Sequence, residues 1–158
     1  MERDSKIKWC CKVKNGISLV EPNKNLAGGF ILKAEKWLED MSNAKYIESK
    51  ILFAYYTIYD SVYAILQRIG AKCEIHSCTF EFIRVFLKKY FSEDEVKFME
   101  KSHDERKNST YYVDREIKNE FAKEMIKKAP EMIIKSRSVI EKITEKEIKL
   151  IREELKQI

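Results

Sequence analysis

Arg106 lies among charged and polar residues in the segment HDERKNSTYYVD, which spans residues 103–114. An arginine can hold a phosphate and balance the charge that develops on it during phosphoryl chemistry. If this arginine serves a ribonuclease, a histidine is expected about five positions later, because imidazole transfers protons near neutral pH. Tyr111 and Tyr112 occupy that part of the segment instead. The segment therefore allows three interpretations: a catalytic site, a binding site or a structural element.

Either of the two histidines in the chain could supply the missing group. His103 precedes Arg106 by three positions, which places both residues on roughly the same face of a helix. His76 precedes another apolar run and could fold toward the helix that carries Arg106. Arg106, His103 and His76 are thus candidate catalytic residues. The alternatives are a surface salt bridge for Arg106 and a hydrogen bond at a helix entry for His76.

Asn108, Tyr111 and Tyr112 are candidate residues for binding nucleic acid or a nucleotide together with Arg106. Tyrosine titrates near pH ~10, so it is a poor base at neutral pH. It can still donate a hydrogen bond to a phosphate or stack on a base. The alternative is packing at a helix end, with the hydroxyl groups reaching water.

Tyr55 and Tyr59 recur at helical spacing with Asp60 beside them. Aromatic residues at this spacing are more often part of a core or a dimer interface than of a site. The Asp60 carboxylate could orient Arg106 or a histidine, but a solvated polar face is the preferred interpretation.

The four cysteines do not have the spacing of a zinc site. Cys10 and Cys11 are adjacent, and Cys73 and Cys78 are separated by four residues. Neither spacing matches the usual CxxC pairs of a zinc site, and adjacent cysteines cannot easily bind one tetrahedral ion. We expect reduced thiols, as in a cytosolic protein, with no metal and no cofactor.

The composition indicates one compact helical domain. The chain has 158 residues, of which 36% are charged and 44% hydrophobic, with four glycines and two prolines. It has no apolar run of the roughly 20 residues that a membrane span needs, and its first residues lack the apolar segment of a signal peptide. We therefore expect a cytoplasmic protein without membrane contact. The net charge of +5 permits weak attraction to nucleic acid.

Apolar spacing predicts a series of helices after a non-periodic arm at residues 1–21. A helix opens after Pro22 with Asn23 or Asn25 as its cap, and a second extends from Tyr46 to Ile69 and ends at Gly70. A third follows Ser77, a plausible N-cap.

Capping boxes at Ser92 and Thr144 predict the starts of the fourth and last helices. Asn108-Ser109-Thr110 should end or kink the fourth helix. A long pattern resumes at Asp114, and Pro130 should kink or split it. With no convincing strand, the prediction is an all-α, up-and-down bundle of about five helices over residues 22–143, with an arm and an added C-terminal helix at 144–158.

Four stretches together resemble the HEPN superfamily, specifically its small prokaryotic and archaeal single-domain branch. They are WCCKVKNGISLVEPNKNLAGGFILKAEKWLE, AYYTIYDSVYAILQRIG, KCEIHSCTFEFI and ERKNSTYYVD. They resemble, in order, the lead-in, the second helix with its tyrosine pair, the turn into the third helix, and the arginine-to-tyrosine part of the fourth. The resemblance covers residue 9 to about residue 143.

The resemblance implies a helical bundle that forms a homodimer, with the fourth helices near the dimer axis. Nuclease members carry an arginine, often a polar residue, and a histidine after four to six residues. In this resemblance Arg106 matches the arginine and Asn108 the polar residue, while Tyr111 and Val113 stand where the histidine is expected. In some relatives a tyrosine after this motif is adenylylated by a partner nucleotidyltransferase.

Three functional hypotheses follow. The first is a HEPN-type homodimer that contacts RNA or nucleotide through Arg106, Asn108 and Tyr111 beside a nucleotidyltransferase partner, in a toxin–antitoxin-like setting and without strong cleavage. The second is an active metal-independent endoribonuclease that uses Arg106 with His103 or His76. The third is a structural interaction module whose polar residues only complete a dimer interface.

Overall fold

The computed structural model describes residues 2–114, 117 and 119–158. Helices make up 78% of the chain and strands 3%. The predicted all-α class is therefore confirmed. Within the described residues the elements are seven helices and two short strands.

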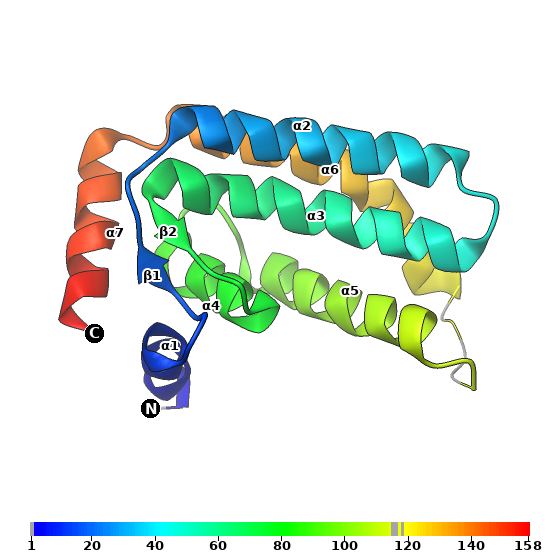
Figure 1. The fold of residues 1–158 in the computed structure, drawn as a ribbon, viewed down its shortest axis with the longest axis horizontal. Coiled ribbons are helices and arrows are strands. Elements are labelled where there is room, and N and C mark those ends of the chain that lie inside the picture. The colour runs from blue at the N-terminus through cyan, green and yellow to red at the C-terminus, as the bar shows by residue number, and fades with distance from the viewer. Residues whose placement is uncertain (1, 115–116, 118) are drawn as a thin grey trace.

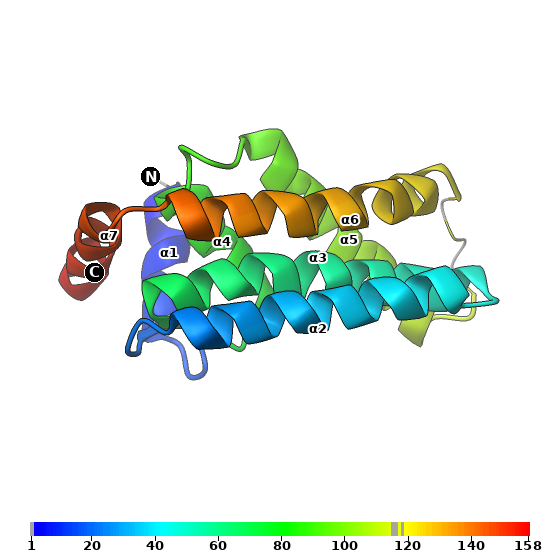
Figure 2. The same ribbon diagram turned by 90° about the horizontal axis from the view of Figure 1, so that it is seen from above.

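Four long helices form the body of the molecule and alternate in direction (Figure 1). They are α2 (Lys24–Asn43), α3 (Ile47–Ile69), α5 (Glu93–Tyr111) and α6 (Asn119–Lys142). Figure 2 shows α2, α3 and α6 extending along the same axis. The central helix is α3, because it packs against α2, α5 and α6 and buries most of its length.

The helix ends that the sequence marked clearly lie where predicted. Asn23 caps α2 by accepting a hydrogen bond from the Leu26 backbone at 2.8 Å. Gly70 ends α3 with φ of 90°, a left-handed conformation that favours glycine. Ser92 and Thr144 begin α5 and α7 (Glu145–Gln157), each with both hydrogen bonds of a capping box.

The arm before α2 has more structure than its sequence indicated. Helix α1 (Glu2–Lys12) crosses one end of the bundle near α7 (Figure 1). The two-residue strands β1 (Ser18–Leu19) and β2 (Ala71–Lys72) then pair in antiparallel register. The expectation that the chain contains no strand was wrong. Strands this short leave no alternating pattern to detect.

Three details of the helical prediction also differ. Helix α4 (His76–Phe86) has Ile75 as its N-cap, so Ser77 lies inside the first turn. Helix α5, by contrast, ends at Tyr111, one residue beyond Asn108-Ser109-Thr110, so its predicted end in this segment is confirmed to within one residue.

The predicted long helix begins at Asn119 rather than Asp114, which lies in a bend. Residues 115, 116 and 118 of that prediction lie outside the described residues. Pro130 is inside α6, and the helix continues through it without a split.

A disulfide joins Cys10 of α1 to Cys78 of α4. The expectation of four reduced thiols was therefore wrong, and Cys11 and Cys73 are the free cysteines. The sequence separation of 68 between the two half-cystines explains why spacing along the sequence did not reveal the pair. Within the part of the chain that the structure describes, no helix is long and apolar enough to cross a membrane.

Candidate functional site

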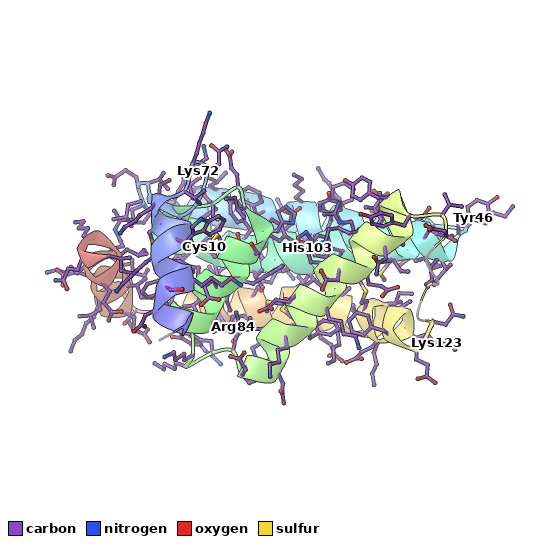
Figure 3. All side chains as sticks on the ribbon, turned by 90° about the horizontal axis from the view of Figure 1, so that it is seen from below. Cys10, Tyr46, Lys72, Arg84, His103 and Lys123 are labelled. Carbon is purple, nitrogen blue, oxygen red and sulfur yellow. A yellow bond between two sulfur atoms is a disulfide. The ribbon has the colours of Figure 1, made fainter. Side chains whose placement is uncertain are left out.

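Helices α3, α4 and α5 bring together the two histidines and Arg106. His76 is the first residue of α4, while His103 and Arg106 lie one turn apart on α5. In Figure 3, α5 crosses over α3, and His103 lies on the side of α5 that faces α4. We call His76, His103, Arg106 and the Tyr55 ring between them the histidine–arginine cluster.

Tyr55 of α3 contacts each of the other three members. Its hydroxyl lies 2.5 Å from His76 Nδ1. Its ring stacks on His103 with centroids 5.3 Å apart, and the Arg106 guanidinium carbon lies 5.2 Å from its centroid. Because Tyr55 is fully buried, its ring holds the three polar side chains in fixed relative positions. Tyr55 can therefore belong to the core, as predicted, and also position the residues of the site.

Both histidines are neutral at pH 7. Burial, together with the neighbouring His103 and Arg106, lowers the pKa of His76 to about 4. Burial likewise lowers the pKa of His103 to about 4, with Lys107 and Arg106 contributing. Their ring centroids lie 5.1 Å apart, and both rings are only partly buried. A neutral imidazole with an accessible edge can accept a proton.

Arg106 is almost buried, with 8% of its surface exposed. Its guanidinium lies against the rings of Tyr55, Tyr56 and Tyr111, with distances to the centroids of 5.2, 5.7 and 5.7 Å. Its Nε has no hydrogen-bond partner among the described residues. Its Nη1 lies 3.5 Å from the Tyr111 hydroxyl, a long and weak contact.

The alternative of a salt bridge between Arg106 and Asp104 is not what the structure has, since Asp104 pairs with Lys107 at 3.3 Å. The guanidinium of Arg106 therefore keeps a donor directed into a half-buried aromatic setting.

The tyrosines that follow Arg106 are exposed rather than packed into the bundle. Tyr111 is 66% exposed and Tyr112 is 43% exposed. Tyr112 caps α5, and its backbone N–H donates to the Asn108 carbonyl at 3.3 Å. Asn108 is half-buried one turn before this end. These three residues extend the histidine–arginine cluster along the last turns of α5.

Asp60 belongs to a different environment. It is 5% exposed, so the interpretation as a solvated polar face was wrong. Its carboxylate accepts a hydrogen bond of 2.7 Å from Trp37 Nε1 of α2, and burial raises its pKa. Tyr59 is buried as expected, and its hydroxyl lies 3.0 Å from the Thr79 hydroxyl.

Residues 2–114, 117 and 119–158 contain no group of three histidine, cysteine or acidic side chains that could hold a metal ion. The cluster offers instead a cation, two neutral imidazoles and a buried phenol. Such a set can bind an anion and move a proton beside it.

Sequence reasoning missed the contribution of Tyr56 and the stack of Tyr59 on His76, whose ring centroids lie 3.9 Å apart. The adjacent tyrosines at 55 and 56 were visible in the sequence, but only packing shows which face each ring occupies. The protein is thus an all-α bundle with a histidine–arginine cluster between α3, α4 and α5. Comparison with protein-family models and with curated proteins gives no match to this chain.

Proposed function

We propose that this protein is a HEPN-like RNA-binding protein that cleaves RNA without a metal ion at the histidine–arginine cluster. The observation that carries the proposal is the convergence of His76, His103 and Arg106 around one tyrosine ring. The four-stretch resemblance and the helical bundle support it further. The histidine that should follow Arg106 along the sequence is replaced by two histidines that meet it in space.

Each residue has a role that its environment suits. Arg106 would attract a phosphate oxygen through its guanidinium and balance the charge on phosphorus. One neutral histidine would accept the proton of the RNA 2′-hydroxyl as its oxygen forms a bond to phosphorus. The bond to the 5′ oxygen would break, and the other histidine, protonated, would donate to that leaving oxygen. The products would be a 2′,3′-cyclic phosphate and a 5′-hydroxyl.

The phosphate itself would make the second histidine available as an acid. In the free protein both histidine pKa values are lowered to about 4, partly by the positive Arg106. A bound anion offsets that charge and stabilises an imidazolium. We therefore expect the free protein to bind RNA more readily as the pH falls below 6.

A second candidate function, RNA or nucleotide binding without cleavage, is favoured by the exposure of Tyr111 and Tyr112. Exposed tyrosines beside a buried arginine can stack on bases while the arginine holds the backbone. The second candidate function includes the predicted homodimer, with α5 near the dimer axis, and the predicted nucleotidyltransferase partner. A cytoplasmic location stays a prediction, and the Cys10–Cys78 disulfide weighs against a strongly reducing compartment.

The test is cleavage and gel shift of single-stranded RNA in EDTA, with wild type, Arg106→Ala and His103→Gln. Removing one proton-transfer group should slow cleavage by about 10²-fold or more. Lys97→Ala is the matched control, because it removes an exposed positive charge from the same helix away from the cluster. RNA with a 2′-deoxy group at the cleaved position should resist cleavage. Binding without cleavage, weakened only by Arg106→Ala, would favour the second candidate, and no binding would overturn both.

A further inference from the structure

Helix α1 is attached to the bundle by few contacts besides its disulfide. Among residues 4–12 only the side chains of Ile7 and Cys10 are buried, and Trp9 is 52% exposed. Lys6 forms an ion pair of 3.7 Å with Glu81 of α4. Two buried side chains and one half-exposed ion pair are a small contact for a helix of 11 residues. The covalent bond to Cys78 is therefore a large part of what holds α1 in place.

The chain after α1 is anchored separately from it. Asn15 has a left-handed φ of 63°, and its carbonyl accepts a hydrogen bond of 2.9 Å from the Glu74 backbone. At the next residue, Gly16, a Cβ atom would lie 2.0 Å from the Cys10 carbonyl oxygen. The pairing of β1 with β2 then fixes the next residues. The Ile17 N–H also donates to the Cys10 carbonyl at 2.7 Å, so release of α1 about the turn at residues 13–16 must break this hydrogen bond while β1 stays paired with β2.

The other end of the disulfide lies in the turn that carries the site. Cys78 belongs to the first turn of α4, which begins at His76. The next residue, Thr79, contacts the hydroxyl of Tyr59, and Tyr59 stacks on His76. The disulfide therefore connects α1 directly to the backbone turn that positions one histidine of the cluster. The Asp4 and Ile7 side chains of α1 also form one wall of a cavity of about 450 Å³ against α4 and α5.

We infer that the Cys10–Cys78 disulfide is a reversible thiol switch that docks α1 on α4 and fixes the turn carrying His76. The reductant is a dithiol. One of its thiolates attacks a half-cystine sulfur, a mixed disulfide forms, and its second thiol displaces the remaining protein thiolate. The protein gains two electrons and two protons, and the dithiol becomes a disulfide. The docking of α1 by the disulfide does not depend on the proposed function, whereas control of RNA cleavage rests on it.

The structure also predicts how the switch is protected. Both half-cystines are fully buried. Burial raises the pKa of the Cys11 and Cys73 thiols, so both are protonated at pH 7 and attack the disulfide slowly. An external dithiol must then wait for α1 to open. We expect the reduction rate to level off at high dithiol concentration, where opening limits it.

The experiment compares amide hydrogen exchange in wild type, in wild type reduced with dithiothreitol, and in the Cys10→Ala, Cys78→Ala double variant. The matched control is Cys11→Ala, which removes a free thiol from α1 and leaves the disulfide intact. We expect residues 2–12 to exchange at least about tenfold faster after reduction and in the double variant. Helices α3 and α6 should be unchanged, and so should the control. NMR resonances of the His76 ring should move in the reduced protein.

Equal protection of α1 with and without the disulfide would overturn the inference. Loss of protection throughout α3 and α6 would overturn it too, because the bond would then maintain the whole fold. Release of α1 with an unchanged His76 resonance would overturn the link to the site. None of these readouts uses RNA, so a failed cleavage assay leaves them intact. If the protein does cleave RNA, reduction should slow cleavage about tenfold or more through displacement of His76.

Discussion

Two arginines, Arg84 on α4 and Arg106 on α5, differ in the hydrogen-bond partners of their guanidinium groups. Nε of Arg84 donates to Glu93 at 3.1 Å, Nη1 donates to Glu81 at 2.7 Å, and Nη2 donates to Glu100. Nε of Arg106 has no hydrogen-bond partner among the described residues. Both guanidiniums are mostly shielded from water, so burial does not explain the difference.

This difference in hydrogen-bond partners indicates which arginine is available to a ligand. Burial by itself lowers the pKa of Arg84, but hydrogen bonds with Glu100 and Glu81 raise it above its ordinary value. Its charge is therefore committed to the fold. Arg106 lies instead against the neutral rings of Tyr55, Tyr56 and Tyr111, which attract a cation without filling its donors. Because Nε itself is buried, an anion would have to approach the Nη side of the guanidinium, and this contrast with Arg84 makes Arg106 the better candidate for binding.

Arg84→Ala should produce the largest change and affect stability. Glu81, which is 1% exposed, would lose the closer of its two cationic partners and keep the Lys6 pair at 3.7 Å. Removing one member of a buried ion pair costs about 3–5 kcal/mol, and urea unfolding at pH 7 measures it. The control is Arg68→Ala, which breaks a pair with the exposed Glu145 and should cost about 1 kcal/mol or less. Equal costs for the two variants would show that the Arg84 network contributes no more than a surface pair.

Arg106→Ala should affect RNA cleavage more than the stability of the fold. The variant loses contacts with three tyrosine rings, each worth about 0.5–1 kcal/mol at exposed sites, but it also removes a buried donor that lacks a partner. We expect a loss of about 1–2 kcal/mol of stability, well below that of Arg84→Ala. RNA cleavage should fall by about 10²-fold or more, since a preorganised cation is lost. A large loss of stability with normal RNA binding would make Arg106 a structural residue like Arg84.

The sequence was informative where local chemistry decides the structure. Asn23, Gly70, Ser92 and Thr144 end or begin helices through hydrogen bonds within a few residues, so their positions were predictable. The end of α5 directly after Asn108-Ser109-Thr110 was predictable for a similar local reason, since these residues are poor helix formers.

The candidate site was predictable only in part. His103 and Arg106 share a helix face, so their proximity followed from spacing. The meeting of His76 with His103, and of Cys10 with Cys78, depends on how α1, α4 and α5 pack. The residue periodicity within each of these helices does not encode how the helices pack on one another. Asp60 was misassigned for a related reason, since its partner Trp37 lies on another helix.

The acid sensitivity of the fold should come partly from the cluster. The folded-state pKa of His76 and of His103 is lowered to about 4, whereas an unfolded histidine titrates near pH ~6.5. As the pH falls from about 6.5 to about 4, the unfolded chain gains protons that the folded chain does not, so stability is lost in that window and is full above it. Because both rings are partly exposed, we expect about 1–2 kcal/mol in total.

Urea unfolding between pH 4 and 7 measures this loss. In a His76→Gln, His103→Gln double variant, the part of the slope that lies above pH 5 should become shallower, while the titration of carboxylates is common to both proteins. An identical slope in the two proteins would mean that the histidines are not held neutral by the fold.

Tyr111→Phe should have the smallest effect and sharpens the contrast between the two arginines. The hydroxyl lies 3.5 Å from Arg106 Nη1 on a side chain that is 66% exposed, so the lost contact is worth about 0.5 kcal/mol or less. RNA affinity should therefore fall by about twofold at most. Tyr111→Ala also removes the ring, and stacking on a base is worth about 1–3 kcal/mol, a loss of roughly fivefold to a hundredfold in affinity. If phenylalanine weakens binding as much as alanine, the hydroxyl completes the Arg106 guanidinium as carboxylates complete Arg84, and the donors of Arg106 are less open to a phosphate than the geometry indicates.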